Sequence, residues 1–324
     1  MKKFFSYIAY LIVAGLWYLL SLLPFCVLYV FSDLLYLLAG RLVHYRHRVI
    51  WKNLRESFPE KSERELRQME HAFYRQFCDY LVETIKMMTI SKKELKRRMH
   101  ISAPESFWQC LDNNQSIAVY LGHLFNWEYM TSLPFWVADD VQCCEIYHPL
   151  ENAYFDSLFL RARERHHALC IPMMESLRRI IGFGKTHRAI VVGYIADQVP
   201  FWNNIHHWVD FLHHDTPVLT GAERIARHTN EACFYAYMRR TRRGYYTCEM
   251  KLITLEPKKS KDFEITDAYF RLLEDNIREQ PSLYLWSHNR WKRTREEFNI
   301  RYNATTGKVD LRDLDVIKRE KGII

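Results

Sequence analysis

The sequence predicts an α/β fold in which a mixed sheet is flanked by helices and preceded by a hydrophobic amino-terminal helix. After Lys92, short apolar runs such as "SIAVYLG" and "AIVVGYIAD" alternate with segments of helical spacing such as "NAYFDSLFLRARERHH". Strand and helix in alternation are typical of an α/β sheet. The chain has 324 residues, 48% of them hydrophobic, which is enough for a substantial buried core.

The uncharged amino-terminal run is the second observation. Residues 4–31 read "FFSYIAYLIVAGLWYLLSLLPFCVLYVF" and contain no charge. About 20 such residues suffice to cross a bilayer, and the apolar run of a cleaved signal peptide is normally much shorter. We therefore expect residues 1–40 to form a retained membrane anchor and residues 41–324 to form one domain. Pro24 leaves two forms open, a single tilted span or a helix followed by a second, interfacial helix.

Charge and cysteine usage indicate where this domain lies. The run has two lysines before it and a heavier positive flank after it, which comprises Arg41, Arg46, Arg48, Lys52 and Arg55. Such a bias places the following chain in the cytoplasm. Eight cysteines without a CxxC pair are expected to be reduced and mostly buried, which agrees with that location. The net charge of +8 favours an acidic partner such as anionic lipid, a phosphorylated metabolite, an acidic protein or nucleic acid.

Two further elements are predicted within the body of the chain. The segment "SERELRQMEHAFYRQFCDYLVETIKMM" opens with Ser62 and Glu65 at capping-box spacing and continues with apolar residues at helical intervals, so it should form an amphipathic helix. The segment "EACFYAYMRRTRRGYYTCEMKLITL" should form a hairpin added to the same sheet. The "HH" doublets do not favour a metal site, because adjacent side chains point apart in a strand.

The stretch "YLGHLFNWEYM" carries the candidate catalytic pair. His123 follows the buried strand "SIAVYLG", and ligand sites in α/β sheets lie at the carboxyl ends of strands. Asn126 is expected to cap the next helix, with Glu128 in its first turn. Glu128 could then accept the Nδ1 proton of His123 and leave Nε2 free to take a proton from a hydroxyl. The alternative is purely structural, because the helix dipole favours a glutamate in the first turn.

An ordered set of motifs resembles a known family. "GHLFNWE" resembles the H-x4-(D/E) box of the lysophospholipid acyltransferase superfamily, in the form used by its lipid A late acyltransferase branch. Further boxes follow in family order over nearly the whole chain: "YHPLEN" with Arg161, "ADQ" at 196–198, "FLHHDTPVLTGAERIAR" and "YLWSHNRWK". The resemblance implies a glycerolipid-acyltransferase-like mixed sheet and a catalytic domain that follows a membrane anchor.

The same resemblance implies an activity and roles for individual residues. It implies transfer of a fatty acyl chain from acyl carrier protein, or less often coenzyme A, to a hydroxyl of a lipid A precursor, at the cytoplasmic face of a bacterial inner membrane. His123 would be the general base and Glu128 its orienting carboxylate. Asn126, Arg161, Asp197 and Gln198 would contact substrate, with backbone N–H groups near Asn126 as donors to the oxyanion. No metal or cofactor is implied.

Departures and alternatives remain open from the sequence. Phe125 stands where that branch usually has glycine, which predicts a bulky side chain beside the base, and His213 and His214 replace glycine in a later box. The acceptor could instead be another lysolipid, such as an amino-acid lipid or a glycerolipid, or the chain could be a non-catalytic lipid-binding membrane protein. A serine hydrolase is disfavoured because no GxSxG elbow occurs. Nucleic-acid binding is disfavoured because no recognisable reader motif accompanies the anchor.

Overall fold

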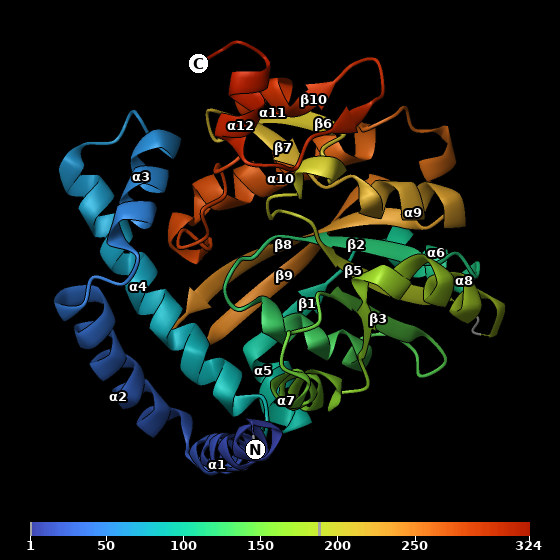
Figure 1. The fold of residues 1–324 in the computed structure, drawn as a ribbon. Helices are drawn as coiled ribbons and strands as arrows, with labels where there is room; N and C mark the ends of the chain where they lie inside the picture. Colours follow the sequence, from blue (N-terminus) through green and yellow to red (C-terminus); the bar gives the residue numbers. More distant parts are fainter. Residues whose placement is uncertain (1, 187–188) are drawn as a thin grey trace.

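The central sheet has seven strands in a computed structural model that describes residues 2–186 and 189–324. Their order is β1-β9-β8-β2-β5-β3-β4, and only the β8–β9 pair is antiparallel. The mixed sheet flanked by helices confirms the predicted fold class (Figure 1). The strands are β1 (Met99–Ser102), β2 (Ile117–Leu121), β3 (Gln142–Tyr147), β4 (Leu169–Pro172), β5 (Ile190–Ile195), β8 (Ala232–Arg242) and β9 (Tyr245–Thr254).

Helices surround this sheet, and two small hairpins lie outside it. The α-helices are α1 (Lys2–Leu22), α2 (Phe25–Tyr36), α3 (His47–Ser57), α4 (Glu63–Lys86), α5 (Lys92–Arg98), α6 (Glu105–Asp112), α7 (Ala153–Glu164), α8 (Ser176–Thr186), α9 (Gly221–Thr229), α10 (Glu264–Glu279), α11 (Arg295–Arg301) and α12 (Leu314–Glu320). Short 3₁₀ or π-helical segments are η1 (Leu37–Leu42), η2 (Trp127–Phe135), η3 (Met173–Glu175), η4 (Trp202–Asn204), η5 (Pro257–Lys259) and η6 (Pro281–Leu283). The hairpins are β6 (His207–Phe211) with β7 (His214–Val218), and β10 (Tyr302–Asn303) with β11 (Lys308–Val309).

The core lies on both faces of the sheet, as expected for strands that read as continuous apolar runs. Every residue of β2 is buried. Its alternate side chains enter different apolar clusters, with Ala118 and Tyr120 on one face and Val119 and Leu121 on the other. The β8–β9 hairpin joins this sheet as predicted.

The amino-terminal run is divided into two helices at Pro24. Helix α1 ends at Leu22 and α2 begins at Phe25, so the break falls at the proline that cannot donate a helical hydrogen bond. Residues Phe25–Leu42 are long and apolar enough to cross a membrane, which by itself is weak evidence for an anchor. Both α1 and α2 pack against α4.

Helix α4 begins with the predicted capping box. The Ser62 hydroxyl accepts a hydrogen bond from the backbone N–H of Glu65, and the Glu65 carboxylate accepts one from the N–H of Ser62 at 2.8 Å. The apolar stripe of α4 is buried against the core, with Leu66, Phe73 and Val82 all nearly inaccessible.

The β6–β7 hairpin is an element that the sequence did not reveal. Its turn residues Leu212 and His213 have φ of 54° and 65°, a left-handed conformation that usually selects glycine or asparagine. The segment "FLHHDT" therefore lacks the ordinary sequence signature of a two-residue turn.

Replacing Ser62 by alanine should destabilise the protein modestly. Loss of an N-cap costs about 1 kcal/mol, which corresponds to a thermal midpoint lower by ~2 °C in detergent. Ser62→Thr keeps the hydroxyl and is the matched control. A midpoint that is equal in the alanine and threonine variants would contradict a stabilising cap.

Candidate active site

Two neighbouring parallel strands bring His123 and Asp197 together. In the register of β2 and β5, Leu121 lies opposite Ile195. His123 and Asp197 each follow two residues later, so both side chains emerge at the same carboxyl edge of the sheet. This edge is the usual location of ligand sites in α/β folds.

Asp197 holds His123 through two hydrogen bonds. Its Oδ1 lies 2.5 Å from His123 Nδ1, and its Oδ2 accepts the His123 backbone N–H at 3.0 Å. Only 2% of the Asp197 surface is exposed. Burial alone would raise the pKa of this carboxyl, but the charge and hydrogen bonds of His123 outweigh it and lower the pKa below its ordinary value. An ionised Asp197 therefore fixes the imidazole with its proton on Nδ1.

The other ring nitrogen of His123 contacts Gln198, and the side chain is partly exposed. The His123 side chain retains 16% exposure, and its Nε2 lies 3.1 Å from the Gln198 amide nitrogen. The indole of Trp127 packs edge-on against the ring, with centroids 5.0 Å apart. Nε2 is thus the nitrogen that can accept a proton, and an incoming hydroxyl would share or replace the contact with Gln198.

Glu128 lies near His123 but pairs with a different residue. Its carboxylate forms two hydrogen bonds with the guanidinium of Arg163 on α7, at 2.8 and 2.6 Å. Trp127 Nε1 also donates to Glu128 Oε1 at 3.2 Å. The sequence led us to expect Glu128 on Nδ1 of His123, whereas Asp197 occupies that position. Glu128 reaches His123 through Trp127.

Arg163, for which the sequence suggested no role, is the arginine of α7 that contacts Glu128. Arg161 is exposed on α7, while Arg163 points toward Glu128. Burial would lower the pKa of Arg163, but Glu128 more than offsets this and raises it, so the guanidinium stays charged. Two residues along a helix turn about 200°, so Arg161 and Arg163 point in different directions.

Asn126 caps the helix after His123, as predicted. Its Oδ1 accepts the N–H of Glu128 at 3.0 Å, and its Nδ2 donates to the buried carboxylate of Glu83 at 3.1 Å. Three nearby backbone N–H groups, those of His123, Phe125 and Glu128, already donate to protein acceptors. They are therefore not free to bind an oxyanion in this conformation.

Phe125 packs into the core next to the site. Its side chain is fully buried, and its ring contacts Phe73, Phe77 and Tyr80 on α4 as well as Trp127. The bulky side chain expected beside the base is thus directed toward α4. Gly122 has a different constraint, because a Cβ there would collide with Leu273 on α10.

Comparison with known families agrees with this geometry. Residues 2–293 match the model of the bacterial lipid A biosynthesis acyltransferase family. The chain belongs to this family. No curated protein matched the chain.

The carboxyl-terminal box of this acyltransferase, together with the residue before it, contacts the loop that carries His123. The backbone N–H of Phe125 donates to the carbonyl of Leu283 at 2.9 Å, and Leu124 forms a β-bridge with Tyr284. Further along, Arg290 is 1% exposed and donates to the carbonyl of Pro217 at 2.8 Å. Burial lowers the pKa of His288 to about 4, so its ring is neutral.

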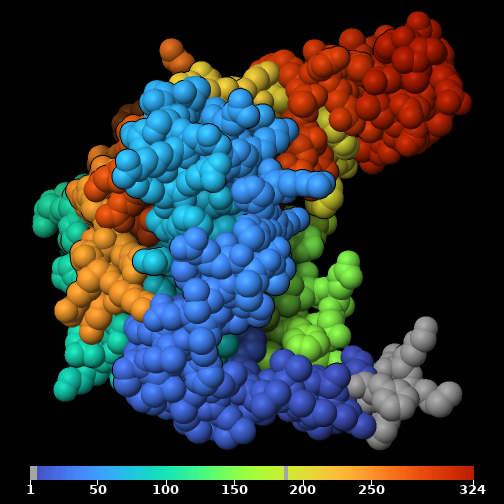
Figure 2. Space-filling model, turned by 90° about the vertical axis from the view of Figure 1, so that its left-hand side faces the viewer, coloured from blue at the N-terminus to red at the C-terminus, as the bar shows by residue number. Residues whose placement is uncertain are grey.

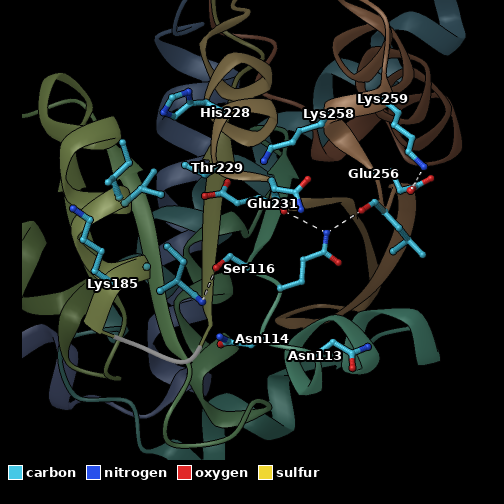
Figure 3. Close-up of a pocket in the computed structure, with 17 residues that line it drawn as sticks. Asn113, Asn114, Ser116, Lys185, His228, Thr229, Glu231, Glu256, Lys258 and Lys259 are labelled. Atoms are coloured by element: carbon cyan, nitrogen blue, oxygen red, sulfur yellow. Dashed lines mark hydrogen bonds and ion pairs between the residues drawn. The ribbon is translucent and has the colours of Figure 1, made fainter.

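A cavity of about 930 Å³ lies at the opposite edge of the sheet from His123 (Figure 3). It is lined by Ser116 and Glu231, which precede β2 and β8, and by Ile190 at the start of β5. These residues mark the amino ends of the strands. The cavity is therefore separate from the His123 site of the acyltransferase.

Titration of Glu83 should make stability depend on pH. Burial raises the pKa of Glu83 from 4.5 to about 7. The folded protein then holds one more proton than the unfolded chain between these values, so stability falls as pH rises through this window. Glu83→Gln cannot ionise, and its thermal midpoint should fall less between about pH 5 and pH 8 than that of the wild type.

Glu231→Gln is the matched comparison for this measurement. Burial also raises the pKa of Glu231 to about 7, but this residue lies at the far edge of the sheet. Both variants should show a reduced pH dependence. If the thermal midpoint of Glu83→Gln fell with pH as much as that of the wild type, while that of Glu231→Gln fell less, Glu83 would be ionised in the folded protein.

Proposed function

We propose that this acyltransferase moves a fatty acyl chain from an acyl thioester, carried by acyl carrier protein, to a hydroxyl of a lipid A precursor. The observation that carries the proposal is the imidazole of His123. It lies in the H-x4-E box of a family member, its Nδ1 is held by a buried carboxylate, and its side chain is partly exposed.

The chemistry follows from the two nitrogens of His123. Asp197 holds the Nδ1 proton, so Nε2 removes the proton from the acceptor hydroxyl. The hydroxyl oxygen attacks the thioester carbonyl, and the tetrahedral intermediate expels the thiolate as the carbon–sulfur bond breaks. The imidazolium then returns its proton to the thiolate. Asp197 stabilises the imidazolium, since a buried ionised carboxylate is adjacent to it.

The remaining predicted site residues are assigned by their positions. Glu128 and Arg163 hold the loop that carries Trp127 and thereby limit movement of the His123 ring. Gln198 lies where a substrate hydroxyl would meet Nε2, so it contacts the acceptor. Arg161 is exposed on a different face of α7 from Arg163, and it is available to an anionic headgroup or to the acidic carrier protein.

Residues 1–40 serve as the membrane anchor in this proposal, and residues 41–324 form the catalytic domain on the cytoplasmic face of the inner membrane. The apolar helix at Phe25–Leu42 and the basic residues after it support this location.

Asp197→Asn should lower kcat and leave KM nearly unchanged. The amide cannot stabilise the imidazolium, whereas substrate contacts remain. We expect a loss of at least ~10²-fold, and His123→Ala should lose ~10²- to 10⁴-fold. Transfer of labelled acyl chains from acyl carrier protein to lipid A precursor measures both parameters.

Asp215→Asn is the control for this series. Asp215 lies on β7, and its exposed carboxylate pairs with Arg295 on α11 rather than with His123. It should keep wild-type kcat. If folded His123→Ala retained wild-type kcat, the proposed base would be excluded.

Deletion of the gene should remove one acyl chain from lipid A. Mass spectrometry of total lipids before and after deletion reports the acceptor and the chain length together. Complementation with His123→Ala should not restore the missing chain, whereas Asp215→Asn should. Intact lipid A together with the loss of an acyl chain from another lipid class would assign the enzyme to that class instead.

A further inference from the structure

The outer face of the two amino-terminal helices is apolar and exposed. Figure 2 shows α1 along the lower edge of one face of the molecule and α2 above it. Large apolar side chains are exposed along both helices and η1, namely Tyr7, Ile8, Leu11, Ile12, Val13, Leu16, Tyr18, Leu19, Leu22, Val27, Val30, Phe31, Leu34, Leu35, Leu37, Leu38 and Leu42. Soluble proteins rarely expose so continuous an apolar surface, which indicates a hydrophobic partner.

The inner face of α2 is fixed to the catalytic domain by polar contacts. Tyr29 donates to Glu83 at 2.9 Å, and Ser32 donates to Asp79 at 2.7 Å. Both acceptors lie on α4. In addition, Asp33 forms an ion pair of 2.7 Å with Arg243 at the β8–β9 turn.

Helix α1 is fixed to the same end of α4. The Trp17 indole donates to the Ile85 carbonyl at 3.0 Å, and Lys86 donates to the carbonyls of Ser21 and Leu23 at 2.7 and 2.9 Å. On its other side, α1 contacts α7 through Tyr10, whose ring stacks with that of Tyr154. Both amino-terminal helices are thus packed on the domain along one side.

These contacts are incompatible with a helix that crosses the bilayer. A spanning α2 would place Asp33 near the middle of the hydrocarbon, together with Asp79 and Glu83 of α4, or would break every contact described above. Charged groups at that depth are expensive. A helix that lies in the interface instead keeps its polar side on the protein and its apolar side in lipid.

We propose that α1, α2 and η1 lie within one leaflet of an anionic phospholipid membrane and do not cross it. The exposed basic residues Arg41 and Arg48 follow this surface, where they would meet anionic headgroups. The inference refines the membrane location in the proposed function, and it places the acceptor lipid and the enzyme in the same leaflet.

Spin-label depth measurements test this arrangement directly. Cysteines at Ile8 and Leu19 on α1, and at Val27 and Leu38 on α2 and η1, form two pairs separated by 11 residues on one helical face. The background is Cys26→Ala, because the other seven cysteines are buried. The full-length protein is placed in vesicles of phosphatidylethanolamine and phosphatidylglycerol, and collision with oxygen and with a water-soluble nickel complex gives the depth of each label.

The two arrangements predict different depths within each pair. A helix in the plane of the membrane gives nearly equal depths, whereas a spanning helix separates the two labels by about 16 Å along the membrane normal. Depths that differ by this amount in either pair would overturn the proposal. A label at Lys258, on the exposed rim of the 930 Å³ cavity, should remain in water and controls for non-specific insertion.

Lipid charge provides a second measurement. Arg41→Gln and Arg48→Gln should each weaken binding to phosphatidylglycerol vesicles by about 5-fold. Unchanged binding would show that Arg41 and Arg48 do not contact anionic headgroups, contrary to the proposal. Neither measurement uses acyl transfer, so failure here is distinguishable from failure of the proposed activity.

Discussion

The hydrogen bonds of the buried Glu83 side chain connect the amino-terminal helix, the sheet and the candidate site, and the rest of the structure depends on them. The Glu83 carboxylate accepts hydrogen bonds from Tyr29 of the amino-terminal helix α2, from Tyr246 of the sheet and from Asn126 of the loop after His123, at 2.9, 3.0 and 3.1 Å. A fully buried carboxylate requires several partners, because an unsatisfied one is costly. Glu83 therefore connects helix α2, the sheet and the candidate site to one position on α4.

The candidate site combines two kinds of support. The strands β2 and β5 place His123 beside Asp197 through their backbone register, which is rigid. The loop that follows is held by side chains instead, with Asn126 on Glu83 and Glu128 on Arg163. Positioning from several elements restricts the imidazole to one orientation, and general-base catalysis depends on that orientation.

Local patterns predicted the elements of the site, but not all of its partners. The strand before His123, the cap at Asn126 and the helix of Ser62 each depend on nearby residues, so the sequence sufficed. The contact with Asp197 depends on β2 and β5 being neighbours, although about 70 residues separate them. Strand order is a property of the whole fold. Identifying Arg163 as the partner of Glu128 would have required knowing which face of α7 points toward the site. The three arginines of "RARER" lie on more than one face, so the sequence did not show which of them it is.

Phe125 illustrates how a departure from a family pattern is absorbed. The sequence suggested a bulky side chain beside the proposed base. In the structure its ring joins Phe73, Phe77 and Tyr80, and it stacks with Trp127 at 5.3 Å. The added volume thus fills space between the catalytic loop and α4, where packing is dense and missing atoms are costly. Since Trp127 also contacts His123, the ring of Phe125 supports the proposed base through Trp127, and this support comes from packing.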